Sequence, residues 1–122
     1  MHGLLNQFVY VDDKPYSIYI GSHCSIAHNA LIHGPSKISK KTFIGFHAVI
    51  HKSIIGRNCF IGHKAVIEGV TLPDNCYVPS GLVIDSEALV ATLPKMPVEK
   101  KVFNKEVVDY NKLLVQHYKC NK

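Results

Sequence analysis

Three histidines in this chain have a side-chain type and a placement that suit metal chemistry. The chain has eight histidines in 122 residues, a high number for its length. His28 and His33 form an H-x-x-x-x-H pair, and His2 stands in a Met-His-Gly run that repeats the form of Ile32-His33-Gly34. Three neutral imidazoles suit Zn²⁺ and leave a fourth position for water. Water in that position has its pKa lowered to about 7 and becomes a nucleophile at neutral pH.

The elements that must position these histidines follow from a six-residue repeat. A period of six matches neither the 3.6 of an α-helix nor the 2 of a β-strand. It fits a coil with three flat sides, in which eighteen residues make one turn and successive coils stack about 4.8 Å apart. The inward aliphatic residues form twelve rungs, or four coils, with one-residue deletions after the sixth and ninth: Ile20, Ile26, Ile32, Ile38, Ile44, Ile50, Ile55, Ile61, Ile67, Leu72, Val78 and Ile84. The sequence therefore predicts a parallel β-helix of hexapeptide repeats.

Small residues four positions after the aliphatic residue are expected at the tight corners of the coil. This assignment explains three of the four cysteines as small hydrophobic residues, in preference to a catalytic thiol. The fourth, Cys120, receives no role, and no C-x-x-C pair suggests a zinc ribbon or a redox motif. The small corner residues are Cys24, Ala30, Ser36, Thr42, Ala48, Cys59, Ala65 and Cys76.

After the last rung the pattern changes from hexapeptide to helical. Ser86 is the predicted N-cap of a short helix from Glu87 to about Thr92. Apolar residues at helical spacing predict an amphipathic helix from about Glu99 to Tyr118, packed along one flank of the prism. We expect one domain, with the β-helix in residues 1–85, a polar loop at about 5–16 that leaves the coil, and the helices in residues 86–122.

Composition and charge restrict the function classes. Hydrophobic residues make up 47% of the chain and charged residues 19%, which is typical of a globular protein. The net charge is +5, and much of the excess comes from lysines after residue 94, so a solvated helix face explains it better than nucleic-acid binding. We find no signal peptide and no apolar run of membrane length, and therefore expect a cytoplasmic protein with reduced cysteines.

Position within the repeat decides where the three histidines point. His33 follows Ile32 on the third face of the first coil, and if Met1 is a third-face rung, His2 lies one coil above, about 5 Å away. His28 lies on the adjacent face and cannot readily join them within one chain. Packing around a three-fold axis would bring His28 of one subunit to His2 and His33 of the next, so a homotrimer with interfacial metal sites is predicted. Each histidine taken alone also fits a surface residue or the general base of an acyltransferase.

Several runs of the sequence resemble the γ-class carbonic anhydrases, a family that includes the anhydrase-like domain of the carboxysome scaffold protein. They are YSIYIG (16–21), SIAHNALIHGP (25–35), FIG (43–45) and YVPSG (77–81). The resemblance implies a left-handed β-helix with a C-terminal helix, trimers with zinc or iron at the interfaces, and reversible hydration of CO₂ to bicarbonate. It implies His2, His28 and His33 as metal ligands and, from the tail run VVDYN, Asn111 as an active-site residue.

The chain also departs from the family pattern. Leu5 stands where the family has a glutamate proposed for proton transfer, and the family's upstream coils are missing, so the chain is expected to be N-terminally truncated relative to the family. His23, His47 or His51 is then expected to carry the proton, because histidine titrates near neutral pH.

The roles of two further histidines and two alternative functions also follow from the sequence. His51 and His63 are expected to stack under His33 and His28, where they fit polar interface groups better than a second metal site. The departures favour, as an alternative, a non-catalytic metal-binding trimer that binds bicarbonate or a protein partner. A hexapeptide acyltransferase that uses acyl-CoA fits less well, because the repeat lacks an extended loop for the substrate.

Overall fold

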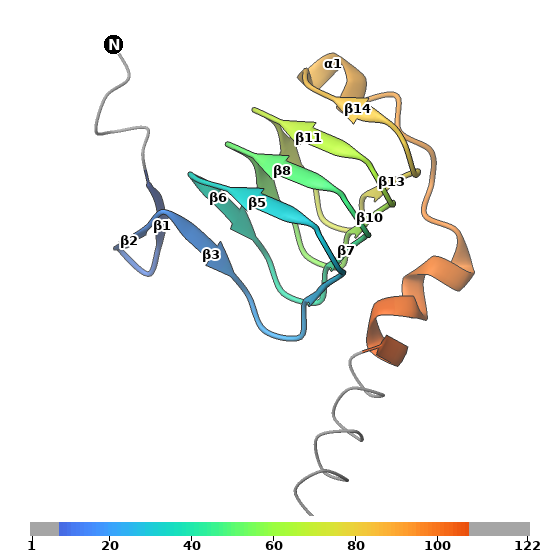
Figure 1. Cartoon of the computed structure of the whole chain (residues 1–122), viewed down its shortest axis with the longest axis horizontal. Helices are drawn as coiled ribbons and strands as arrows, with labels where there is room; N and C mark the ends of the chain where they lie inside the picture. The colour runs from blue at the N-terminus through green and yellow to red at the C-terminus, as the bar shows by residue number, and fades with distance from the viewer. Residues whose placement is uncertain (1–7, 108–122) are drawn as a thin grey trace, which may run out of the picture.

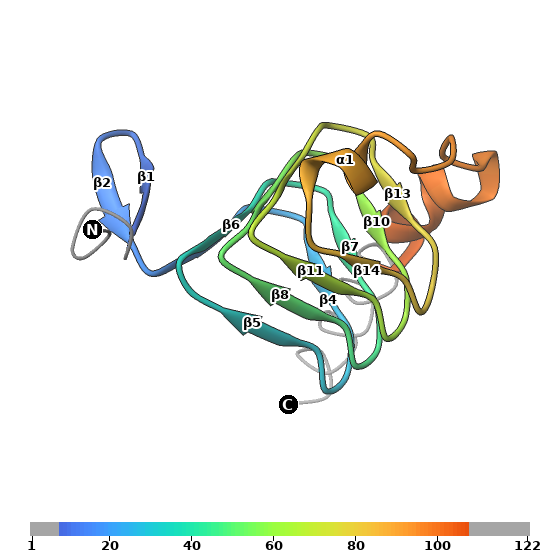
Figure 2. The same cartoon turned by 90° about the horizontal axis from the view of Figure 1, so that it is seen from above.

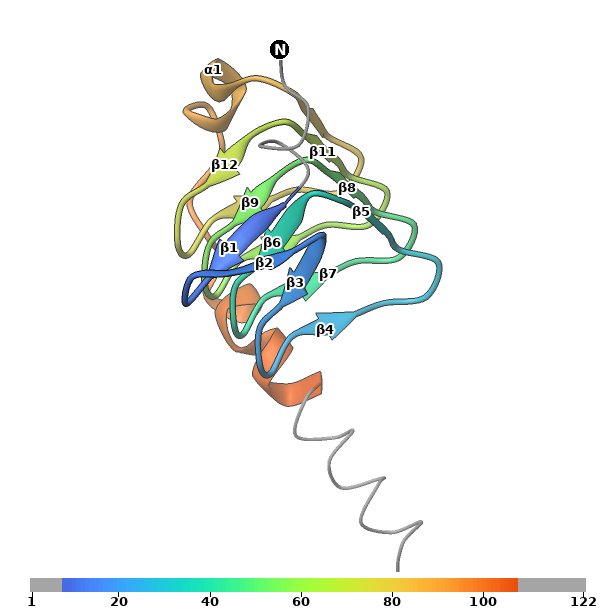
Figure 3. The same ribbon diagram turned by 90° about the vertical axis from the view of Figure 1, so that its left-hand side faces the viewer.

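Twelve short parallel strands form the body of the protein. The computed structural model describes residues 8–107, and its strands form three four-stranded sheets that make the sides of a prism (Figures 1 and 3). Each coil adds one strand to each sheet, so the four predicted coils are confirmed and the protein is a left-handed parallel β-helix. The first sheet contains β3 (Ile18–Ile20), β6 (Ser36–Ile38), β9 (Ile54–Ile55) and β12 (Thr71–Leu72). The second contains β4 (Ser25–Ile26), β7 (Phe43–Ile44), β10 (Phe60–Ile61) and β13 (Tyr77–Val78), and the third β5 (Leu31–His33), β8 (Val49–His51), β11 (Val66–Glu68) and β14 (Val83–Ile84).

The register of the strands follows the repeat. Ile20 pairs with Ile38, and Ile38 pairs with Ile55, so the inward aliphatic residues stack directly on one another. Residues with positive φ mark most corners, because this conformation reverses the chain direction within a short turn. From Lys41 to Gly81 these residues are six apart, except that Lys52 and Gly69 each follow the preceding one after five. Both one-residue deletions therefore lie at the corner between the third and first sheets.

The small corner residues fill the interior of the prism and also bond to the neighbouring coils. The hydroxyl of Thr42 donates to the carbonyl of Gly56 at 2.9 Å and accepts from the N–H of Cys59 at 3.2 Å. Such bonds satisfy backbone groups that the corner takes out of the sheet ladders. The cysteines on the described corners are free thiols, as predicted, and the buried apolar corner residues are Ala48, Cys59, Ala65 and Cys76.

The segment that was expected to leave the coil as a loop is a β-hairpin that projects outside the prism (Figure 2). β1 (Val9–Val11) pairs antiparallel with β2 (Lys14–Tyr16). Asp12 and Asp13 connect them with φ of 51° and 65°, the pair of positive values that a tight two-residue hairpin turn requires. The two aspartates therefore form the turn, and the alternating residues on either side form the strands.

A short helix and the segment after it cover the last coil. α1 (Glu87–Val90) begins after Ser86, whose side chain accepts a hydrogen bond from the N–H of Leu89, so the predicted cap is confirmed. Val90 and Leu93 pack against the buried aliphatic core. The C-terminal end of the prism is thereby protected from solvent.

Residues 98–107 are helical and lie against the outer face of the second sheet (Figure 1). The ring of Phe103 contacts Phe43 and Phe60 with centroid distances of 5.0 and 5.7 Å. The Asn104 side chain donates to the carbonyl of His23 at 2.8 Å. The predicted packing of this helix on a flank is confirmed for residues 98–107, and the remainder of its expected range lies outside the described residues. No helix within residues 8–107 is long and apolar enough to cross a membrane.

Candidate metal centre

His33 lies at the end of β5, on the outer face of the third sheet, and one of its ring nitrogens forms a hydrogen bond. Nδ1 donates to the carbonyl of Gly34 at 3.0 Å. Because that nitrogen carries the proton, the neutral ring presents the lone pair of Nε2 outward, which is the form that binds a metal ion. The side chain is exposed at this position. His33 therefore has the tautomer and the accessibility of a metal ligand.

His28 lies in the turn between β4 and β5, one corner before His33 on the same coil. The turn is closed by Asn29, whose φ is 61°. The imidazole stacks on the ring of Phe46 in the next coil, with a centroid distance of 6.0 Å and an interplanar angle of 4°. This contact holds the ring plane while leaving the side chain exposed. His28 is thus oriented by an aromatic neighbour.

The other predicted site residues fall on both sides of the described range. His2, Leu5 and Asn111 lie outside residues 8–107, so their places in the site stay predictions. Within that range, no group of three His, Cys, Asp or Glu side chains comes together in a way that could hold a metal ion. The two described candidate ligands are therefore side chains of one exposed coil that need further donors.

His51 lies directly beside His33, in register on β8. The two rings meet edge to face at 4.7 Å, and Nδ1 of His51 lies 3.6 Å from the carboxylate of Glu68 on β11. The stacking of His51 under His33 is confirmed. The outer face of the third sheet thus carries a row of His33, His51 and Glu68 on three successive strands.

His63 lies two coils below His28, not immediately beneath it. Phe46 occupies the intermediate coil, and its ring stacks on His63 with centroids 4.8 Å apart. Nδ1 of His63 accepts a hydrogen bond from the Phe46 N–H at 2.8 Å. Gly45 leaves room for this ring, since a Cβ there would lie 2.7 Å from Nδ1. The hydrogen bond and the stacking assign His63 a packing role in the corner.

The remaining histidines that were expected as proton carriers lie on corners. The N–H of His47 donates to the carbonyl of His28 at 3.2 Å, which places it in the coil beneath the candidate ligand. His23 lies on the corner that Asn104 contacts. The ring of His51, by contrast, contacts the candidate ligand His33.

A row of aliphatic residues on the third sheet was missed in the sequence. The signal in the sequence is an apolar residue immediately before each inward isoleucine of this sheet. Because successive side chains of a strand point to opposite faces, that residue lies on the outer face. Leu31 and Val83, at the two ends of the row, are 56% and 54% exposed. No described segment covers the row, whereas residues 98–107 cover the second sheet. The row consists of Leu31, Val49, Val66 and Val83, which pair in register.

The comparison with known proteins shows which family the chain belongs to. A family described as the GMPPB C-terminal domain matches residues 14–108. The chain belongs to this family. It is also 38% identical over 116 residues to a carbonic anhydrase of Methanosarcina thermophila, covering 93% of the chain and 47% of that protein. The expected resemblance to the γ-class carbonic anhydrases is confirmed.

Other relatives are carboxysome assembly proteins. The chain is 36% identical over 121 residues to the carboxysome assembly protein CcmM of Nostoc sp., covering 98% of the chain and 22% of that protein. It is 32% identical over 117 residues to the CcmM of Synechococcus elongatus, again covering 22% of the relative. The chain thus spans less than half the length of these curated relatives.

Proposed function

We propose that the chain forms a metal-dependent carbonic anhydrase centre that hydrates CO₂ reversibly to bicarbonate. The observation that carries the proposal is the exposed pair of His28 and His33 on one coil, in a chain that is 38% identical to a carbonic anhydrase over nearly its whole length. His2 and His33 of one subunit and His28 of the next are the proposed ligands. Imidazole donors suit Zn²⁺ first and Fe²⁺ as the alternative.

The described residues fit such an ion in their donor chemistry. The bond from Nδ1 of His33 to Gly34 is the supporting contact that metal-binding histidines usually have, and it leaves Nε2 available. Phe46 restricts the rotation of His28. When bound, the metal would supply Lewis-acid chemistry that activates water for attack on CO₂. Leu31, two residues before His33 on the same face of β5, offers an apolar wall suited to an uncharged substrate.

The proposed site is completed in a homotrimer and not within a single chain. Residues 8–107 of one chain bring no three donors together, and in the proposed trimer a neighbouring copy contributes His28 to the site. The outer face of the third sheet carries the exposed aliphatic row beside His33, and apolar rows of this kind mark contact surfaces. The second sheet is already covered by residues 98–107 (Figure 1). The third sheet is therefore the proposed contact with the next subunit.

Proton transfer away from the centre completes the proposed reaction. His51 is the proposed carrier, because its ring contacts His33 and its Nδ1 faces Glu68. Imidazole accepts and releases protons near neutral pH. Asn111 stays a predicted active-site residue.

The test combines metal content with activity. We expect Zn²⁺- or Fe²⁺-loaded protein to hydrate CO₂ in stopped-flow assays much faster than the free ion does. His28→Ala and His33→Ala should each lower both the rate and the bound metal, measured by mass spectrometry of the metal per chain. His63→Ala is the matched control and should keep its metal. A wild-type rate equal to that of the free ion would rule out the catalytic proposal.

A non-catalytic relative is the second candidate. It is favoured by the carboxysome assembly proteins among the relatives and by Leu5 in place of the family glutamate. It would use the metal to hold the subunits together. Full metal content and a stable trimer without CO₂ hydration would establish it. Loss of the trimer on chelation would then measure the structural contribution of the ion.

A further inference from the structure

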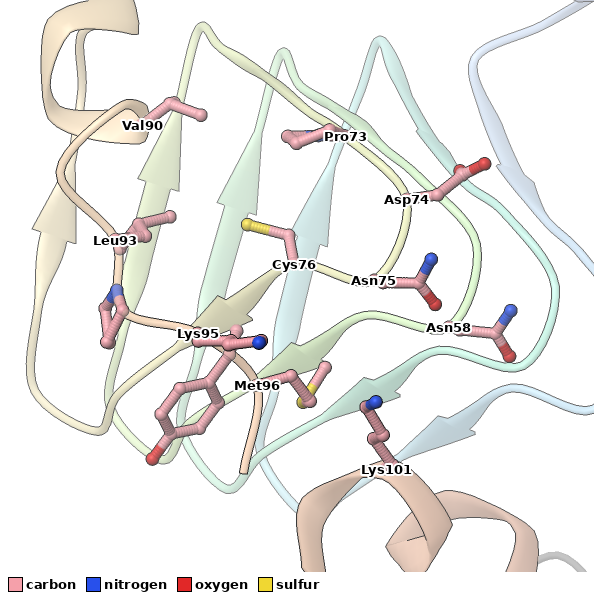
Figure 4. Close-up of a pocket in the computed structure, with 12 residues that line it drawn as sticks. Asn58, Pro73, Asp74, Asn75, Cys76, Val90, Leu93, Lys95, Met96 and Lys101 are labelled. Atoms are coloured by element: carbon pink, nitrogen blue, oxygen red, sulfur yellow. The ribbon is translucent and has the colours of Figure 1, made fainter. Parts of the chain in front are cut away.

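A pocket lies at the opposite end of the molecule from the exposed first coil, at the corner between the first and second sheets. Its volume is about 620 Å³. The corner after β12 forms one wall, the segment after α1 forms the second, and the helix at 98–107 supplies Lys101 from below (Figure 4). None of the residues proposed for the metal centre lines it.

Two lysines give this pocket its charge. Lys95 comes from the segment after α1 and Lys101 from the helix, and their ammonium groups reach into the same space (Figure 4). Neither lysine forms an ion pair with a carboxylate within residues 8–107. Asn58 and Asn75, on successive coils of the corner, add amide groups at the rim. The pocket therefore offers several donors and two positive charges that a ligand can neutralise.

The one carboxylate at the rim is already neutralised. Asp74 accepts from Arg57 through the backbone N–H at 2.7 Å and through the guanidinium at 3.0 and 3.3 Å. These bonds hold the pKa of Asp74 below its usual value, so it stays ionised and paired. Its side chain points away from the two lysines (Figure 4). Lys37 and Lys40 line a neighbouring pocket that shares Asp74, and they add to the positive potential of this corner.

One side of the pocket is apolar. Leu93, Pro94 and Met96 line the side formed by the segment after α1, and Met96 is only 8% exposed. Small-molecule sites usually combine an apolar lining with a few placed polar groups in about 300–1,000 Å³. The volume here lies in that range and far exceeds what bicarbonate requires.

We propose that this pocket binds a small organic anion, with its acid group between Lys95 and Lys101 and its apolar body against Leu93, Pro94 and Met96. A carboxylate and a phosphate monoester share the chemistry that two lysines recognise, since each presents several acceptor oxygens. The site is independent of the proposed metal centre.

Three probes of matched size test the proposal on the full chain by saturation-transfer NMR titration: benzoate, phenyl phosphate and benzyl alcohol. We expect one or both anions to bind and the neutral alcohol to bind at least about tenfold more weakly, because charge-assisted hydrogen bonds are lost. The tighter anion identifies the acid group. Equal binding of the alcohol would overturn the proposal, because the lysines would then contribute nothing.

Variants locate the binding. Lys95→Gln/Lys101→Gln should weaken anion binding about tenfold or more, and Lys95→Arg/Lys101→Arg should retain it. Lys52→Gln/Lys64→Gln removes the same charge from the other two corners and is the matched control, with an expected change below about twofold. Binding should also persist in His33→Ala, which excludes the metal centre. An equal loss in the control pair, or no loss in the glutamine pair, would overturn the proposal.

Discussion

The first coil and the coils that follow it share one sequence pattern but differ in burial. Ile20 and Ile26 of the first coil are 44% and 40% exposed, whereas Ile38 and Ile44, one coil further, are fully buried. An inward side chain is covered only when another coil or a capping segment lies on each side, as in other stacked repeats. The end position therefore explains the difference, because the residue types are the same.

Because of this difference, the candidate ligands and the residues that stabilise the fold lie in different coils. His28 and His33 belong to the exposed coil, while the buried isoleucines that hold the prism together lie in the following coils. Segments with little buried apolar surface open more easily than the core does. A metal ion or a second subunit bound at the first coil would stabilise a part of the fold that buries less apolar surface than the coils after it.

The largest expected effect compares the same substitution in the two regions. Ile44→Ala should lower the free energy of unfolding by about 2–5 kcal/mol, because it removes a fully buried side chain and leaves a cavity. Ile26→Ala, at the paired position on the adjacent strand, should cost less than half as much. Urea unfolding followed by circular dichroism at one protein concentration measures both. Equal losses would show that the first coil is covered in solution.

A second pair of substitutions tests the buried hydroxyls. Ser53 donates to the carbonyl of His51 at 2.9 Å and accepts from the N–H of Val70 at 3.3 Å. Ser53→Ala should therefore cost about 1–3 kcal/mol, because it leaves a buried N–H without its acceptor. Ser25, in the first coil, buries its hydroxyl without a hydrogen bond to any residue in the described range. Ser25→Ala should be neutral or stabilising in the same urea experiment, and a loss as large as that of Ser53→Ala would contradict the comparison.

The period of the sequence predicts the body of the fold well. It places all twelve strands and both deletions, because each rung makes the same local demand for an inward aliphatic residue and a small corner residue. The cap at Ser86 is predicted by its residue type, after the repeat has ended. It does not predict the exposure of Ile20 and Ile26, because a repeat carries no information about where the stack is covered. It also does not reveal the hairpin turn at Asp12 and Asp13, whose polar residues resemble an open loop.

The candidate site is predictable in position and less so in contacts. The repeat places His28 and His33 on the first coil and His51 under His33. Ring orientation depends on neighbours in other coils, such as the carbonyl of Gly34 and the ring of Phe46, which no period specifies. The pocket with Lys95 and Lys101 depends on the path of the chain after α1, where the repeat has ended.

The smallest expected effect is a difference in thiol modification rate between a corner cysteine of the first coil and one of the buried coils. Burial raises the pKa of Cys59 to about 12, so at pH 8 only about one thiol in ten thousand is the reactive thiolate. Burial also raises the pKa of Cys24, but its side chain is only partly buried and lies in the first coil. We therefore expect N-ethylmaleimide to modify Cys24 of the native protein before Cys59, which should react only after unfolding. Peptide mass mapping in a Cys120→Ser background follows each site separately. Because modification of Cys59 requires the stacked coils to part while Cys24 needs only the end coil to open, equal rates would mean that the whole prism opens as one unit.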